Sequence, residues 1–374
     1  MANIMDYLAW RGDIAFAYSP FNDLDSLVLA SLSYLNYPAA SAPVHELGVQ
    51  LPSVDQKQFA FVHECRALLS AAAMTERFAG VQVQHPVAVT DPERDMQFAA
   101  VTFALPDGSH YVGFRGTDST IVGWREDFNM AFESPVPAQS AALTYLKEAA
   151  AMTEGPLILG GHSKGGNLAV YAAAHADPIL QSRIRLVYSF DGPGLDDATM
   201  ASQGYAAIAR RIRSFIPQQS VVGLLLAYHP DYTVVKSTGV GLLQHDSFTW
   251  QVLGTDFIAV TELDVSSQLV DQTVHAWLSK VSPEKRRIFF NTIFDLLEAT
   301  GANTVKELVK DVPGRTSAIL KALQKVDLET AIMIITLWGQ FVSIGASNIF
   351  DLVRQRTAPD HERIQGETNH GTEA

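Results

Sequence analysis

The sequence is poor in cysteine and in positive charge, and each scarcity excludes a class of protein. The single cysteine, Cys65, rules out an intrachain disulfide framework and fits a reducing cytoplasm, where we expect the protein to reside. Lysine and arginine number 27 against 40 aspartate and glutamate residues, a net charge of −13 that disfavours nucleic acid and anionic membrane surfaces as partners. The amino-terminal residues lack a basic segment followed by an apolar one, so no secretory signal is predicted.

Long apolar runs are also missing. The most apolar window, 331–345, is shorter than the roughly 20 residues that cross a bilayer, and it contains Gln340. We expect a buried helix there; the alternative is a helix that makes transient contact with lipid or with a partner. Cys65 lies in an amphipathic helical pattern over 59–69, so we expect an inert, buried thiol.

What remains is a globular composition, with 47% hydrophobic residues in 374, enough for one large domain or two. From residue 98 onward, strand patterns alternate with helical ones. The strands are expected at 98–104, 110–115, 157–160, 185–190, 210–217 and 232–237, and the helices at 138–152 and 164–176. This alternation predicts the α/β class, with a mostly parallel sheet covered by helices on both faces.

Three parts of the chain are predicted. Residues 1–252 form the α/β domain and begin with a helical extension over 1–85. A helical module follows over 253–356, where strand signals are few, and 357–374 form a flexible tail.

The stretch 157–169 carries the strongest chemical signal. An apolar strand enters the turn Gly-His-Ser-Lys-Gly at 161–165, and an alanine-rich helix leaves it. Glycines at 161 and 165 permit the tight, strained turn that exposes the hydroxyl of Ser163, and the helix points its free N–H groups at any oxyanion formed there. The pattern predicts a nucleophile elbow.

A serine nucleophile needs a histidine as general base, and in α/β-hydrolases that histidine comes after the serine and the acid in the chain. Four histidines between Ser163 and the tail are candidates. His245, at the close of the α/β part, is the preferred base, and His229, before a proline, is the alternative. His175 lies too far along the helix after the elbow, and His275 lies among apolar neighbours of the helical module.

For the triad acid we expect Asp191, which ends the strand after the elbow helix and precedes Gly-Pro-Gly. An aspartate before Gly-Pro is also a common turn former, so Asp231 and Asp246 remain alternatives. The oxyanion hole is expected from the backbone N–H of Lys164 and that of Thr117, which follows the strand 110–115.

These residues resemble those of class 3 lipases, the fungal triacylglycerol-lipase branch of the α/β-hydrolases. Phe-Arg-Gly-Thr at 114–117, with Trp124 and Asp127 downstream, is similar to the oxyanion strand of that family. Gly-His-Ser-Lys-Gly-Gly at 161–166 is similar to its elbow, with Lys164 in place of the usual leucine, and 245–250 to its terminal histidine block. The resemblance covers roughly 95–252.

The chain resembles the bacterial Mbeg1-like family more closely, through the opening motif at 3–13 and Ser-Phe-Asp-Gly-Pro-Gly at 189–194. One departure from class 3 lipases concerns the acid. Ser220 stands where those lipases carry their aspartate, so the resemblance implies that the acid has moved one strand earlier, to Asp191. Ser220 then has no assigned role.

The function expected from these residues is that of a serine hydrolase acting on carboxylic esters of lipid or acyl type, through Ser163, His245 and Asp191, with no metal or organic cofactor implied. A thioesterase would use the same groups. The rival from another class is a non-catalytic hydrolase-fold scaffold that binds a lipid or a protein. Whether 119–136 forms a moving lid and which oligomer forms are left open.

Overall fold

The computed structural model describes residues 1–298 except 56–57, 59, 118–124, 128 and 131–132, and beyond 298 only residues 328, 330, 332, 333 and 336. The helices expected within 303–355 and the tail 357–374 therefore lie almost wholly outside the described residues. So does much of the segment 119–136. Within the described part, no helix is both long and apolar enough to cross a membrane.

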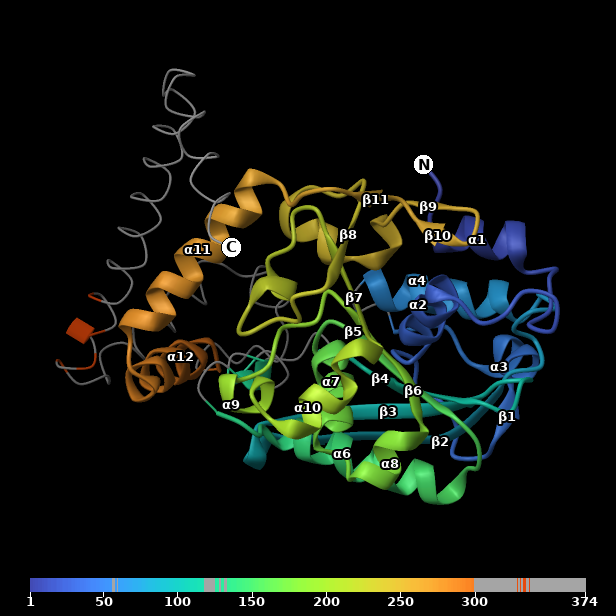
Figure 1. The fold of residues 1–374 in the computed structure, drawn as a ribbon, viewed down its shortest axis with the longest axis horizontal. Helices are drawn as coiled ribbons and strands as arrows, with labels where there is room; N and C mark the ends of the chain where they lie inside the picture. Colours follow the sequence, from blue (N-terminus) through green and yellow to red (C-terminus); the bar gives the residue numbers. More distant parts are fainter. Residues whose placement is uncertain are drawn as a thin grey trace, which may run out of the picture.

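A nine-stranded sheet forms the centre of the molecule, with neighbouring strands in the order in which they occur in the chain (Figure 1). Strands β4 to β8 are parallel, whereas the strands on either side of them pair antiparallel. The strands are β1 (Ala42–Pro43), β2 (Gln82–Asp91), β3 (Met96–Ala104), β4 (His110–Phe114), β5 (Leu157–His162), β6 (Ile184–Phe190), β7 (Ile212–Pro217), β8 (Tyr232–Val235) and β11 (Ala259–Val260).

The helices that connect the parallel strands share one face of this sheet. They are α6 (Pro137–Met152), α7 (Lys164–His175), α8 (Pro178–Arg183), α9 (Asp197–Met200) and α10 (Gln203–Ile208). Right-handed crossovers that always advance in the same direction bring every connecting helix to the same side of the sheet. Alternate strand residues such as Val112 and Leu159 meet them there.

The opposite face is covered by the amino-terminal helices, because the crossovers supply nothing to that side (Figure 1). These helices are α1 (Ile4–Arg11), α2 (Asp23–Leu32), α3 (Val44–Gln50) and α4 (Ala60–Ala72). Their core includes the intervening strand residues, Tyr111 and Ile158 among them. Asn3 and Asn22 begin α1 and α2 with capping boxes.

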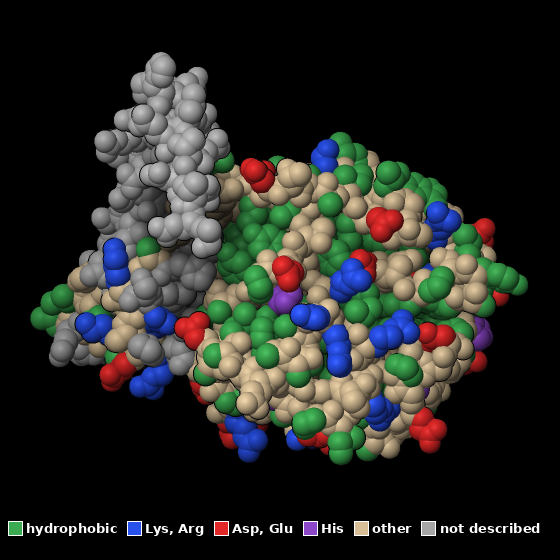
Figure 2. All heavy atoms as spheres, viewed as in Figure 1, with side chains coloured by type: hydrophobic (Ala, Val, Ile, Leu, Met, Phe, Trp, Pro, Cys, Tyr) green, Lys and Arg blue, Asp and Glu red, His purple; other side chains and the backbone are tan. Residues whose placement is uncertain are grey.

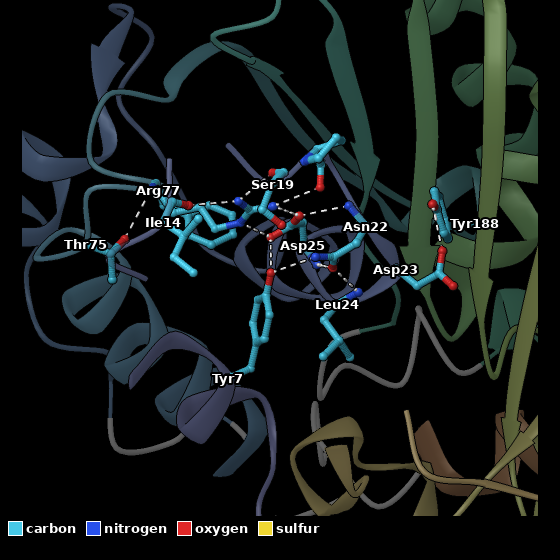
Figure 3. A network of polar contacts seen from close by, with 12 residues as sticks. Tyr7, Ile14, Ser19, Asn22, Asp23, Leu24, Asp25, Thr75, Arg77 and Tyr188 are labelled. Carbon is cyan, nitrogen blue, oxygen red and sulfur yellow. Dashed lines mark hydrogen bonds and ion pairs between the residues drawn. The ribbon is translucent and has the colours of Figure 1, made fainter. Parts of the chain in front are cut away.

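A buried polar network fastens these helices together (Figure 3). The guanidinium of Arg77 donates to both carboxylate oxygens of Asp25, at 2.7 and 2.5 Å, and to the backbone oxygens of Ile14 and Ser19. The hydroxyl of Tyr7 donates to the same carboxylate at 2.6 Å. Both charged side chains are buried, so each depends on the other for its solvation.

Beyond the main sheet, β9 (Val252–Leu253) and β10 (Asp256–Phe257) form a short hairpin, followed by α11 (Val265–Lys280) and α12 (Pro283–Glu298). Trp277 packs on Phe289 between the two helices, with ring centroids 5.5 Å apart. Figure 2 shows apolar side chains exposed over β8 and beside α11. A hollow of about 570 Å³ lies there, lined in part by Tyr232 and Val260.

The predicted α/β class is confirmed, and the order of strands, elbow and helices is that of an α/β-hydrolase fold. The hairpin of β3 and β4, the helices α6 and α7 and the strands β5 to β8 lie within a few residues of their expected positions, whereas α8, α9 and α10 were not predicted. The amino-terminal region 1–85, expected to be mostly helical, contains α1 to α4 but also β1 and the start of β2, which were not predicted. Pro86 and a shift in register between Gln84 and Val87 break the alternation by which β2 would have been recognised.

Candidate active site

Ser163 occupies a strained turn between β5 and α7. Its φ of 58° is in the left-handed region that non-glycine residues rarely adopt. The backbone holds this turn, since Ser163 N donates to Phe190 O at 2.9 Å and Ser163 O accepts from Gly166 N at 2.9 Å. A Cβ on Gly165 would lie 2.1 Å from Phe114 O, so only glycine lets α7 begin this close to the end of β4.

Asp191 begins the turn that follows β6, the strand beside β5. Its side chain is buried, and both of its carboxylate oxygens have partners. Oδ2 lies 2.7 Å from His245 Nδ1, while Oδ1 accepts from Ser220 Oγ at 2.5 Å and from Gly223 N at 3.1 Å. The next residue is a glycine for a steric reason, because a Cβ at 192 would lie 2.8 Å from Ser163 O.

His245 ends the 3-10 helix η4 (Gly241–His245). Its bond to Asp191 fixes the ring by Nδ1–H and leaves Nε2 as the atom that can accept a proton from a serine. Within the described residues, no hydrogen bond joins the Ser163 hydroxyl to this ring. Catalytic hydrogen bonds are often loose in the absence of substrate and tighten in its complex. The structure thus brings His245 and Asp191 into contact and joins Ser163 to them through its neighbours.

The link between the serine and histidine segments is His162, the residue before Ser163. Its Nε2 lies 2.7 Å from His245 O and its Nδ1 lies 3.1 Å from Tyr34 Oη, so Nε2–H donates to the carbonyl and Nδ1 accepts from the tyrosine. The ring also stacks on Phe61 of α4. Burial, followed by the neighbouring His245, holds the pKa of His162 well below its usual value. The link is therefore a neutral one at physiological pH.

Among the described side chains, none of the alternatives from the sequence takes part in the contact between His245 and Asp191. His229 Nδ1 is 2.7 Å from Tyr205 Oη, and His175 stacks on Tyr171 of its own helix. The side chain of His275 lies outside the described positions. Asp246 caps Phe248 N at 2.9 Å. Asp231 makes no hydrogen bond or ion pair with His245 among the described contacts, and in this part of the chain no group of three or more His, Cys, Asp or Glu side chains could hold a metal ion.

Thr117 follows β4 and stands close to the elbow, since a Cβ on the preceding Gly116 would lie 3.1 Å from Ser163 Cβ and 2.6 Å from His162 O. The Thr117 hydroxyl donates to Asp127 Oδ2. Burial raises the pKa of Asp127 from 3.8 to about 6, while Lys164 and the Thr117 hydrogen bond oppose that rise. The backbone of Lys164 begins α7, so the two expected oxyanion donors flank the serine from adjacent strand ends.

Three residues around the site had no role in the sequence interpretation. Ser220, left unexplained there, donates to the acid. The absence of an aspartate at 220 was the signal that this position mattered. His162 and Tyr34 gave no signal, because residues 128 apart in the sequence meet only in the folded chain.

A family model described as Mbeg1-like matches residues 72–295. The chain belongs to the Mbeg1-like family. This Mbeg1-like match includes the elbow, Asp191, His245, α11 and most of α12, and it begins at the last residue of α4. No curated protein matches the sequence.

Among solved structures, this Mbeg1-like protein is similar to lipases at low identity. The crystal structure of M37 lipase has 15% identity and a TM-score of 0.35, with 54% of this chain and 68% of that chain covered. A mutant form of MDLA from Penicillium cyclopium has 13% identity and a TM-score of 0.34, covering 65% and 87%. The Rhizomucor miehei lipase propeptide complex has 15% identity and a TM-score of 0.33, covering 66% and 75%.

Proposed function

We propose that this Mbeg1-like protein is a serine hydrolase that cleaves carboxylic esters of lipid or acyl type through an acyl-enzyme. The observation that carries the proposal is the 2.7 Å contact between His245 Nδ1 and a buried Asp191, at the sheet edge where the strained turn holds Ser163. A histidine that a carboxylate orients, with its other nitrogen free to accept the proton of a serine hydroxyl, is the arrangement that activates a serine.

In the proposed reaction, Ser163 Oγ attacks the acyl carbonyl while His245 Nε2 takes its proton. The Asp191 carboxylate stabilises the imidazolium that forms, and the N–H groups of Thr117 and Lys164 donate to the oxyanion. Return of the proton to the leaving alkoxide releases the alcohol. Water, deprotonated by the same histidine, then attacks the acyl-serine and frees the acid.

The substrate class is supported by the surroundings of His245. Val240 and Leu243, just before it, are 73% and 71% exposed, so an apolar acyl chain would find apolar contacts beside the proposed base. Cys65 is free and buried, which is compatible with the cytoplasm that we propose as the compartment.

Labelling with an alkyl fluorophosphonate tests the proposal. We expect one adduct, on Ser163, together with turnover of short p-nitrophenyl esters, and both should vanish in Ser163→Ala. Ser140→Ala removes an exposed hydroxyl from α6 and serves as the matched control. A folded protein that neither labels nor turns over esters would refute the proposal and favour the scaffold. Faster turnover of acyl thioesters than of oxygen esters would instead identify a thioesterase.

A further inference from the structure

The residue after the proposed nucleophile carries a buried charge. Lys164 has an exposed fraction of only 1%, and its chain runs from the start of α7 to β3. Nζ donates to Glu126 Oε2 at 2.9 Å, to Gln97 O at 3.0 Å and to Gln97 Oε1 at 3.3 Å, and it lies 3.6 Å from Asp127 Oδ1. Three acceptors occupy the three N–H bonds of the ammonium, so this lysine is a charged anchor rather than a base.

Glu126, which accepts a hydrogen bond from Lys164 Nζ, is itself fully buried. Its Oε2 also accepts from Gln97 N at 3.0 Å, and its Oε1 accepts from Ala138 N at 2.8 Å. One carboxylate therefore joins β3, the start of α6 and the start of α7. Because these partners are backbone groups and a paired cation, the carboxylate is held at one place.

Asp127 links the Lys164 side chain to Thr117, which lies beside the turn that holds Ser163. Its Oδ2 accepts from the Thr117 hydroxyl, and its Oδ1 faces Lys164 Nζ. The pairing of β4 with β5 ends at Phe114 and Gly161, three residues before Thr117. Beyond that point Arg115 N still bonds to Ala99 O, whereas the Thr117 side chain depends on Asp127.

We propose that Lys164 is a positioning residue that holds the two oxyanion donors at a fixed separation. Its own N–H is one donor, and its side chain, through Glu126 and Asp127, anchors the segment that carries the other donor at Thr117. The inference rests on the proposed function. An oxyanion hole works when its donors lie about 2.7–3.1 Å from the developing charge, so a shift of one donor costs rate without costing ground-state binding.

Lys164→Met tests the proposal, because it keeps most of the length and removes the charge. We expect kcat for a p-nitrophenyl ester to fall about 10- to 100-fold, less than the loss of a whole donor, while KM changes little. Affinity for a trifluoromethyl ketone, which adds reversibly to a serine and leaves an oxyanion, should fall by a similar factor. Thr117→Val should act through the same connection, so its effect and that of Lys164→Met should not be additive.

Asp127 provides a second readout. Since Lys164 opposes the raised pKa of this carboxyl, Lys164→Met should move its titration further upward from about 6. If the ionised Asp127 holds the Thr117 segment in its active position, the acidic limb of the kcat/KM profile should shift to higher pH in the variant. An unchanged limb would show that the charge state of Asp127 does not act on catalysis.

The control is Arg77→Met, which also unpairs a buried carboxylate but lies among the amino-terminal helices and contacts no proposed catalytic group (Figure 3). It should lower the melting temperature while the folded protein keeps its kcat and its ketone affinity. If Lys164→Met does not fold because Glu126 is left unpaired, Lys164→Met with Glu126→Gln removes the stranded charge, and the same losses in kcat and ketone affinity are expected.

Unchanged kcat and ketone affinity in the folded variants would overturn the inference while leaving the proposed function intact. If the wild type itself neither labels nor turns over esters, the proposed function fails, and amide hydrogen exchange still tests the anchor. Residues 114–117 should then exchange faster in Lys164→Met than in the wild type and in Arg77→Met. Equal protection in all three proteins would refute the anchoring role.

Discussion

Ser220 and Asp191 follow neighbouring strands and are joined by a hydrogen bond between their side chains. The carboxylate sits after β6, and the hydroxyl after β7 donates to it. Gly223 N donates to the same oxygen, Oδ1, which leaves Oδ2 for His245. Ser220 and Gly223 together occupy Oδ1, so Oδ2 is the oxygen that meets the histidine.

Replacing Ser220 by alanine should weaken this arrangement without removing the acid. One of the two donors to Asp191 Oδ1 is lost, and a hydrogen bond to a charged group is worth about 1.5–3 kcal/mol. We expect kcat to fall about tenfold with little change in KM, as steady-state kinetics on a p-nitrophenyl ester would show. Ser140→Ala on the surface of α6 should leave both constants unchanged. An equal kcat in Ser220→Ala would show that Gly223 alone orients the acid.

For single residues, the sequence was informative where a residue's expected role follows from its position at a strand end and from its order in the chain. Ser163, Asp191 and His245 were expected from strand ends and from the order serine, acid, histidine, and the structure brings the last two into contact. Their catalytic roles remain predictions. The contacts of Ser220, His162 and Lys164 could not be read from the sequence, because a hydroxyl, an imidazole or an ammonium reveals no partner until distant strands lie side by side.

At the scale of elements, α1 is fastened to the histidine segment. Asn3 Oδ1 accepts from Met5 N and so caps α1, while Asn3 Nδ2 donates to Phe248 O at 2.8 Å. Val252 N donates to Ala2 O at 3.1 Å. The segment that follows His245 is thus tied at two points to the residues that begin α1.

Asn3→Asp separates these two roles of one side chain. The carboxylate still caps the helix, so the melting temperature should change little, whereas the donor to Phe248 is replaced by an oxygen that repels the carbonyl. We expect kcat to fall a few-fold through looser placement of His245. Thermal denaturation and steady-state kinetics check this, with Asn22→Asp at the cap of α2 as the matched control. An identical kcat in the two variants would contradict it.

Elements were predicted well where periodicity is regular and poorly where tertiary contacts decide. The strand into the elbow and α7 stand out because their residues are apolar or small throughout, as a doubly covered strand and a buried helix require. The two-residue strands β1 and β11 are too short to give a pattern. They exist because a sheet edge offers them hydrogen bonds.

For the whole molecule, pH should act on stability through a pair of carboxyls beside the candidate active site. Burial, the charge of Asp246 and a hydrogen bond to it raise the pKa of Glu64 from 4.5 to about 7, and burial also raises the pKa of Asp246. The folded state thus binds a proton that the unfolded chain has released. The stabilisation is fully present below about pH 4.5 and is lost as the pH rises through about 7.

A glutamine side chain cannot ionise, so Glu64→Gln should remove this loss of stability with rising pH. We expect the wild type to lose stability between about pH 5 and 8 and the variant to lose distinctly less, measured as urea midpoints at about pH 5, 7 and 8. Glu148→Gln on the exposed side of α6 is the control and should follow the wild type. Parallel curves for the wild type and Glu64→Gln would show that the pair does not govern the dependence.

The bond from Asn3 to Phe248 joins residues 245 positions apart in the chain. A polypeptide emerges from the ribosome in order, so the amino-terminal helices are made long before the strands and the histidine segment against which they pack. Such long-distance closure slows folding and prolongs the exposure of apolar faces. We therefore expect the nascent chain to depend on chaperones until the histidine segment has emerged. A fragment trimmed to the region that the family model matches would lack most of the amino-terminal helices, and one face of its sheet would stay exposed to water.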